Sequence, residues 1–355
     1  MLEANFYLLG VVMSVVYVAC DPSLVSGGPE LLHQLCYHLR MSVGLDSKMY
    51  YYGKFLQSQV LNEYSCYNNP VAVDIIDQKN NILIVPEVYN LMCIFSKFSN
   101  IKKVIWFLSV DNYYLSRYKM SHFFVKRVMN KLSNICFKKK IFDIEIFSGL
   151  VKRINISNDH FVQSADLIMT NSYRGLDYLA ECGYSAVYLS EYLNDAFLND
   201  VSFDIPKKNI VVYNPLKGMD FTKQIIEKMH HVQFVPVQNM SRNDVIRLLS
   251  EAKLYIDFGN HPGKDRLPRE AAMMGCCVIT GKEGSAGNFR DVPIQDQFKF
   301  KNDEKFLPSI MQAIDDCLIN YSFRIRDFEH YRSTIRAEKN IFISDLKSIA
   351  SKYFC

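Results

Sequence analysis

The sequence predicts an α/β protein with two doubly wound domains, each built around a parallel β-sheet. A chain of 355 residues exceeds a single ordinary hydrophobic core, which favours two units. Short apolar runs alternate with stretches of helical periodicity along the chain, as they do in strand–helix–strand units. We expect an N-terminal domain over 1–203, a second domain over 204–325 and a closing helical segment over 326–355.

The composition excludes several classes of protein. The net charge is +4 and the isoelectric point about 8.4, a bias too mild to indicate a nucleic-acid-binding protein. The ten cysteines include no Cys-x-x-Cys pair, and most of them lie in apolar runs. We therefore expect small buried side chains in a reducing compartment, the cytoplasm, rather than disulfides or a zinc site.

The first element is predicted from an apolar run between Phe6 and Cys20. No basic residues precede this run, and it is short for a membrane-spanning helix. It leads directly into the turn sequence DPSLVSGG, so we expect a buried β-strand. A membrane segment is the alternative, and Met13 is an alternative start that would leave MSVVYVAC as the strand.

A helix is predicted next. Gly27 and Gly28 open a stretch in which Leu31, Leu35 and Leu39 recur on one helical face. Because glycines let a backbone approach a ligand closely, this Gly-Gly turn is a candidate ligand-facing corner. A simple tight turn is the alternative.

Two compact apolar strands are predicted within 81–89 and 102–114, and each ends in polar residues. These polar residues are Glu87, Ser109, Asp111 and Asn112. Ligands bind beyond the carboxyl ends of strands in open α/β sheets, so these side chains are candidates for substrate binding or for a catalytic base. Capping of the loops is the alternative role.

Basic residues dominate the segment 117–153. It contains ten lysines and arginines but only two acidic residues, Asp143 and Glu145, and aromatic and aliphatic residues are interleaved with them. A basic amphipathic helix with exposed aromatic side chains is typical of a surface that lies on anionic lipid, so we expect peripheral membrane contact. A solvated cationic surface is the alternative, and no nucleic-acid-reading module accompanies the segment.

The same alternation continues to the end of the chain. A strand at LIMTN precedes a helix that Gly183 ends, and a strand at AVYL follows. The second domain is expected to begin near Lys207 with the strand KNIVVY, and Ser241 with Asp244 resembles a capping box at a helix start. The pattern over 306–353 is helical.

The segment 255–290 concentrates the polar chemistry. An apolar strand breaks at Gly259, a polar loop follows, and a helix is expected from Pro268. The loop contains His261, Lys264, Asp265, Arg266 and Arg269. Two arginines, a lysine and the free N–H groups of a helix start together favour a phosphate-binding loop. A solvated basic loop is the alternative.

The string PREA at 268–271, after this glycine-containing loop, resembles the donor-binding segment of family-4-like GT-B glycosyltransferases. The resemblance implies two Rossmann-like domains that face each other across a cleft, with C-terminal helices bracing the first domain. It also implies that Glu270 holds the ribose hydroxyls of a nucleotide sugar. The family has a second glutamate eight residues earlier, where this chain has Pro262. That role is then unfilled or passes to Asp257, His261 or Asp265.

The resemblance implies roles for further residues on both sides of the cleft. The donor-binding residues would be Lys217, Gln238, Asn239, Gly259, Lys264, Arg269 and Glu270. The residues on the acceptor side would be Gly27, Gly28 and Glu87. The catalytic residues would be His261, Arg266 and Asp111. Lys217 would reach the diphosphate, whereas Gln238 and Asn239 would lie near the nucleobase.

These features predict a glycosyltransferase that moves a sugar from a nucleotide donor to a glycan or lipid-linked acceptor. The glycosyltransferases that this chain resembles act in bacterial surface-polysaccharide biosynthesis (lipopolysaccharide O-antigen or capsule). We therefore expect this protein at the cytoplasmic face of the inner membrane. We expect a UDP-linked hexose or a CMP-linked acid sugar as co-substrate, with no cofactor. Cationic side chains and helix N–H groups can neutralise the leaving phosphate, so no metal is expected. A nucleotide-sugar epimerase and a catalytically inactive carbohydrate-binding protein are the alternatives.

Overall fold

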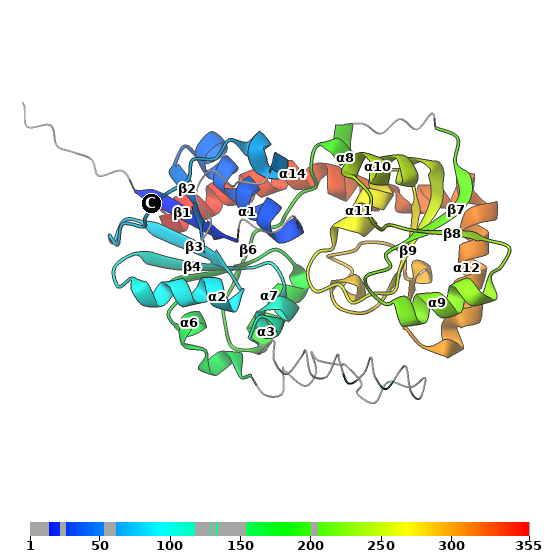
Figure 1. Cartoon of the computed structure of the whole chain (residues 1–355), viewed down its shortest axis with the longest axis horizontal. Coiled ribbons are helices and arrows are strands. Elements are labelled where there is room, and N and C mark those ends of the chain that lie inside the picture. Colours follow the sequence, from blue (N-terminus) through cyan, green and yellow to red (C-terminus); the bar gives the residue numbers. More distant parts are fainter. Residues whose placement is uncertain are drawn as a thin grey trace, which may run out of the picture.

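The computed structural model describes residues 14–21, 26–52, 62–117, 129, 133, 154–199 and 205–354. These residues form two parallel β-sheets that lie side by side with helices packed around them (Figure 1). The strand order is β2-β1-β3-β4-β5-β6 in the first sheet and β11-β10-β9-β7-β8 in the second. Neighbouring strands run parallel throughout both sheets. The predicted α/β class with two doubly wound units is confirmed.

The first sheet comes from the N-terminal half of the chain. Its strands are β1 (Val15–Cys20), β2 (Asp46–Tyr51), β3 (Ile82–Pro86), β4 (Lys102–Phe107), β5 (Leu167–Thr170) and β6 (Val187–Tyr188). Strands β1 and β3 are buried along almost their whole length, which explains their continuous apolar sequences. The edge strand β2, which the sequence analysis does not predict, alternates buried and partly exposed residues.

Helices cover both faces of the first sheet. They are α1 (Gly27–His38), α2 (Tyr89–Met92), α3 (Val110–Leu115), α6 (His160–Gln163) and α7 (Tyr173–Glu181). On one face, Leu35 of α1 shares a hydrophobic core with Val18 of β1. On the other face, Leu179 of α7 shares a core with Ile105 and Phe107 of β4. The sheet therefore forms the middle layer of a three-layer domain.

The second sheet is formed by the C-terminal half. Its strands are β7 (Lys208–Tyr213), β8 (Gln233–Pro236), β9 (Ala252–Asp257), β10 (Cys277–Gly281) and β11 (Lys299–Phe300). Its helices are α9 (Met219–Lys228), α10 (Arg242–Glu251), α11 (Arg266–Met273), α12 (Leu307–Ile319) and α13 (Tyr321–Arg324). The capping box of Ser241 and Asp244 is confirmed at the start of α10. Helix α11 begins at Arg266, two residues before the predicted start at Pro268.

One long helix connects the two domains. Helix α14 (Glu329–Ile349), red in Figure 1, extends from the second domain to the first. Its Tyr331 and Ile335 belong to the core of the second domain, whereas Phe342 and Leu346 belong to the core of the first. The short helix α8 (Ala196–Asn199) precedes the predicted boundary at 203, which lies outside the described residues.

The predicted membrane-facing basic surface is described only in small part by the structure. Residues 138–140 and most of the predicted basic surface lie outside the described ranges. Arg117, counted as part of that surface, has a side chain only 9% exposed, which pairs with Asp159 and covers the Tyr113 ring. No helix in the described part of the chain is both long enough and apolar enough to cross a membrane. Each of the eight described cysteines is a free thiol.

Candidate active site

A cavity of about 290 Å³ lies between the two domains, where the loops after several strands meet. The first domain contributes Gly27 and Gly28 after β1 and Leu108 after β4. The second domain contributes Lys217 after β7 and the loop 262–267 after β9. All of these loops follow the carboxyl ends of parallel strands, the edge at which open α/β sheets bind ligands.

Two helices begin beside this cavity. Among the described residues, α11 has no side-chain cap, because the Asp265 carboxylate accepts from Lys217 Nζ at 2.7 Å instead. Helix α9 likewise begins without a side-chain cap, after Gly218 with a φ of 60°. A Cβ atom at Gly218 would lie 2.2 Å from the Phe258 oxygen, so glycine is required there. Both helix starts offer N–H groups and the positive end of a dipole, an arrangement suited to an anion.

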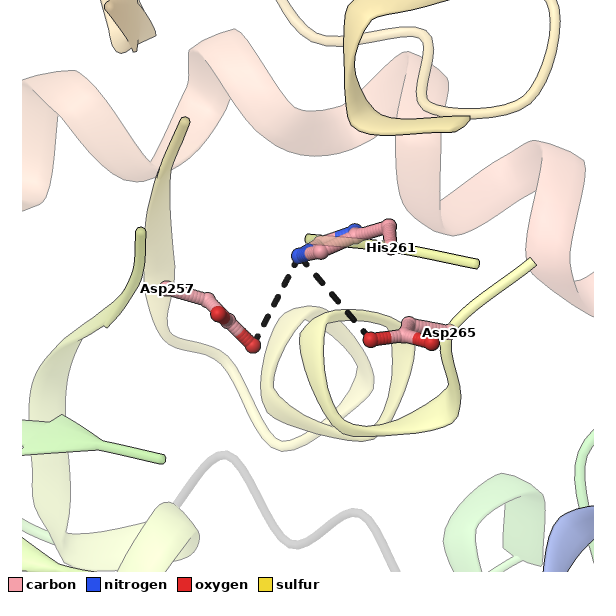
Figure 2. A group of neighbouring side chains, drawn as sticks. All are labelled: Asp257, His261 and Asp265. Carbon is pink, nitrogen blue, oxygen red and sulfur yellow. Dashed lines mark ion pairs between the residues drawn. The ribbon is translucent and has the colours of Figure 1, made fainter. Parts of the chain in front are cut away.

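A buried charge cluster lies behind Lys217 and Asp265. Figure 2 shows the His261 ring between Asp257 and Asp265. His261 is fully buried, and its Nε2 lies 3.6 Å from Asp257 Oδ2 and 4.0 Å from Asp265 Oδ2. Asp257 Oδ2 also accepts from the Tyr255 hydroxyl at 2.8 Å. Burial alone would raise the pKa of Asp257, but the neighbouring His261 helps to hold this pKa below its ordinary value.

The ligand atoms of Asp257, His261 and Asp265 lie within 4.8 Å of one another, so these three residues could hold a metal ion. The Lys217 ammonium already supplies a positive charge at the same Asp265 oxygen. His261, predicted as a catalytic residue, does not line the cavity, and its ring instead lies between the two aspartates. Gly259 donates its N–H to Asp257 at 2.8 Å, and a Cβ there would lie 2.3 Å from Lys217 Cβ. Gly259 thus lets the two loops meet.

Lys264 and Arg269, both predicted to bind the donor, are instead paired with buried carboxylates. Lys264 Nζ lies 2.6 Å from Glu338 Oε1 of α14, and Arg269 Nη1 lies 2.9 Å from Glu338 Oε2. Arg269 Nη2 contacts Glu191, which follows β6. Burial alone would lower the pKa of Lys264, but the Glu338 carboxylate raises it. Arg269 is 1% exposed and both of its terminal nitrogens are occupied, so it joins the domains in this structure.

Arg266 lines the cavity and also reaches across it. Its Nη1 lies 2.5 Å from Glu30 Oε2 in the first turn of α1, and Arg242 lies 3.6 Å from the same oxygen. Burial alone would raise the pKa of Glu30, but Arg266 beside it lowers this pKa. Arg266, predicted as a catalytic residue, and Arg269 thus each have a carboxylate partner of their own.

Asp111, predicted as a catalytic group, also joins the two domains. Its Oδ1 lies 2.7 Å from Arg174 Nη2, and its Oδ2 accepts from Asn260 Nδ2. Arg174 donates in addition to the Pro262 oxygen at 2.9 Å. Asp111 does not line the interdomain cavity, and both of its oxygens have partners. The structure therefore places it in an interdomain contact rather than in the position of a base.

Comparisons with known proteins show which fold this is. No family model matches the chain. An alpha-1,6-glucosyltransferase of Actinobacillus pleuropneumoniae serotype 7 is 31% identical over 140 residues, which cover 34% of this chain and 42% of that protein. The match thus spans less than half of the relative's length.

Solved structures are similar over nearly the whole chain. A glycosyltransferase from Rickettsia africae has a TM-score of 0.55 at 13% identity, covering 97% of this chain and 98% of its own. The HepE protein of Anabaena, in complex with UDP and glucose, has a TM-score of 0.56 at 10% identity, covering 96% and 98%. Sucrose-phosphate synthase of Thermosynechococcus elongatus has a TM-score of 0.59 at 12% identity, covering 96% and 99%. This chain has the GT-B fold.

A second cavity, of about 250 Å³, lies within the first domain of the GT-B fold. It shares Gly28, Leu108 and Asn112 with the interdomain cavity, so the two adjoin. Glu87, predicted on the acceptor side, lines the second cavity directly after β3. Its Oε2 accepts from the Leu108 N–H at 2.9 Å, and burial raises the pKa of Glu87 to about 7.

Of the seven residues predicted to bind the donor, five do not line the interdomain cavity, Gly259 and Arg269 among them. Gln238 and Asn239 are exposed after β8. Glu270 lies on α11 with its Oε1 3.8 Å from Arg266 Nε, and burial raises the pKa of Glu270. The roles of these residues in donor binding stay predictions.

The charged partners that cross between the domains of this GT-B fold were not predicted from the sequence. They include Glu30, Glu191 and Glu338, and also Arg174, which donates to the Pro262 oxygen. A signal existed for Glu338, which lies on the same helical stripe as Tyr331, Ile335 and Phe342, all buried. A buried carboxylate on an apolar stripe requires a partner. The sequence alone does not identify this partner, Lys264, which is 74 residues away.

Proposed function

We propose that this chain is a glycosyltransferase that moves a sugar from a nucleotide donor to an acceptor. The observation that carries the proposal is the interdomain cavity, which Lys217 and Arg266 line beside the uncapped start of α11. The leaving group of such a transfer is a nucleotide phosphate. Fixed cations and helix N–H groups stabilise the charge that develops on it in the transition state.

The comparisons support a UDP-linked hexose as the first donor to test. The HepE structures contain UDP with glucose or UDP-glucose, and the relative that matches part of the chain is a glucosyltransferase. In our proposal the diphosphate lies against Lys217 and the start of α11, with Glu270 toward the ribose and Gln238 and Asn239 toward the base. A CMP-linked acid sugar is the second donor to test.

We also propose a glycan or lipid-linked acceptor, within the synthesis of a bacterial surface polysaccharide such as lipopolysaccharide O-antigen or capsule. The sequence resemblance supports this process. We propose in addition that the basic residues of 119–153 contact the cytoplasmic face of the inner membrane. We propose transfer without a metal ion, because the Lys217 ammonium provides positive charge at Asp265 and beside the cavity.

A thermal-shift screen with UDP, CMP, GDP and ADP, each with and without EDTA, tests the donor site. UDP should raise the melting temperature in both conditions, because a ligand that binds only the native state stabilises it, by about 2.7 kcal/mol at a hundred times its Kd. UDP-glucose should then release UDP. A protein that no nucleotide stabilises would contradict the proposal. If the protein isomerises a donor in the absence of an acceptor, it is an epimerase. If it binds nucleotides but turns over no donor, it is catalytically inactive.

A further inference from the structure

The second cavity has a chemical character of its own. None of the described residues that line it is lysine, arginine or histidine, whereas Glu87 and Asp21 are carboxylic acids. Pro29, Leu32 and Leu91 provide apolar walls. A cavity of this kind disfavours an anionic ligand and suits an uncharged one with hydroxyl groups and an apolar face.

Glu87 is placed in this cavity by the sheet itself. It directly follows β3, and its carboxylate accepts from the backbone of Leu108, which directly follows the neighbouring strand β4. Leu108 also lines the interdomain cavity. A proton acceptor here would therefore lie beside the proposed donor site without belonging to it.

The groups around Glu87 favour a proton-transfer role near neutral pH. Burial raises the pKa of Glu87, backbone N–H groups lower it, and the Arg117 charge lowers it further, which leaves the pKa at about 7. The other titratable groups lining the cavity are Cys20, Asp21 and Tyr52, at the carboxyl ends of β1 and β2. A general base is most effective when its pKa lies near the working pH.

We propose that Glu87 accepts the proton of the hydroxyl group to which the sugar is transferred, and that this hydroxyl belongs to an uncharged acceptor held in the second cavity. The proposal rests on the glycosyltransferase function proposed above. The acceptor O–H bond breaks, and its proton moves to the Glu87 carboxylate. The freed oxygen forms a bond to the anomeric carbon, while the bond from that carbon to the phosphate oxygen breaks and leaves its electron pair on the phosphate.

A purely structural role is the competing explanation, in which Glu87 only ties the ends of β3 and β4 together. Glu87→Gln separates the two roles. The amide oxygen of glutamine can still accept from the Leu108 N–H, so the tie remains, but glutamine does not accept a proton at neutral pH. Glu181→Gln, at the exposed end of α7, is a matched control in the same domain.

The experiment measures UDP release from UDP-glucose, and from other nucleotide sugars if UDP-glucose is not used, with water and with phenyl β-glucoside as acceptors. In wild-type protein and in Glu181→Gln the rate should fall below pH 7. Glu87→Gln should bind UDP as wild type does, turn over at least a hundredfold more slowly and lose this pH dependence. Phenyl β-glucoside should be preferred to phenyl β-glucuronide.

The outcomes separate this inference from the proposed function. Wild-type turnover with an equally active Glu87→Gln, or with the pH dependence retained in that variant, would overturn the role of Glu87 alone. Preference for the glucuronide would overturn the uncharged acceptor. A wild-type protein that binds no nucleotide, or that turns over no donor, would overturn the transfer reaction and the role of Glu87 with it.

Discussion

At the scale of single residues, Lys217 is more available to a donor than Lys264 or Arg266, the other described cations that line the interdomain cavity. About a third of its side chain is exposed (34%), although its ammonium is paired with Asp265. A diphosphate would compete with Asp265 for this ammonium. We expect Lys217→Met to weaken UDP binding about ten- to a hundredfold, the loss typical of one charge-assisted hydrogen bond.

Isothermal calorimetry with UDP measures this effect. Lys223→Met is the matched control, because Lys223 lies on α9 in an exposed pair with Glu227. Equal UDP affinity of Lys217→Met and wild type would place the diphosphate elsewhere in the molecule.

Glu87 also predicts a dependence of stability on pH that requires no substrate. Its pKa is about 7 in the folded protein against an ordinary value of 4.5. The folded state thus binds this proton more tightly, so the stabilisation is fully present below pH 4.5 and is lost as the pH rises through 7. Glu87→Gln, which does not ionise, should gain stability relative to wild type between pH 5 and pH 8, by up to about 3 kcal/mol.

Urea denaturation at pH 5 and at pH 8 gives this difference directly. Glu181→Gln should show the same stability relative to wild type at both values. A Glu87→Gln difference that is independent of pH would mean that Glu87 titrates normally in the folded protein.

At the scale of elements, the loop between β9 and α11 touches the first domain through its backbone. A Cβ atom at Gly263 would lie 2.2 Å from the Leu108 oxygen, well inside van der Waals contact. Gly263→Ala should therefore push the domains apart, with a larger radius of gyration in small-angle X-ray scattering. At Gly28 the added atom would lie 3.6 Å from Leu108 Cδ1, an ordinary contact, so Gly28→Ala should leave the radius unchanged. An equal radius in both variants would show that the loop yields instead.

The predictability of the elements follows from how each one is buried. Strands such as β3 and β10 are buried along their length and therefore appear in the sequence as continuous apolar runs. The edge strand β2 has only Ser47 and Met49 fully buried, so no such run marks it. Residues 71–77 are apolar in part but form only a bridge between Met49 and Val71.

The candidate site was predictable to the same limited extent. Its loops could be located, because Lys217 and the segment 262–267 lie next to recognisable strands. Whether their charges are free to bind a ligand could not be predicted, because the partners of Arg266 and Arg269 come from the other domain and from α14. A local sequence pattern shows that a charged residue is present, but only the folded structure shows which residue neutralises its charge.

At the scale of the whole molecule, α14 anchors both domains through one buried carboxylate. Glu338 contacts Lys264 and Arg269, and Arg269 also contacts Glu191 of the first domain. Arg269→Met would leave an uncompensated buried charge, so we expect a loss of about 3–5 kcal/mol of folding free energy. Thermal or urea denaturation measures it. Arg336→Met is the control, because it removes only an exposed pair with Glu329 on the same helix and should change stability by less than about 1 kcal/mol. Equal losses of stability in Arg269→Met and Arg336→Met would contradict the anchoring role.

The path of α14 also has a consequence for synthesis on the ribosome. One face of the first sheet is covered by Phe342, Leu346, Ile349 and Phe354, which are translated more than 150 residues after β6. Until they emerge, the nascent first domain displays an apolar surface that its own sequence cannot cover. Such a surface attracts chaperones and promotes aggregation. The first domain should therefore reach its native state only after the second has been made, which reverses the usual order of domain folding along a chain.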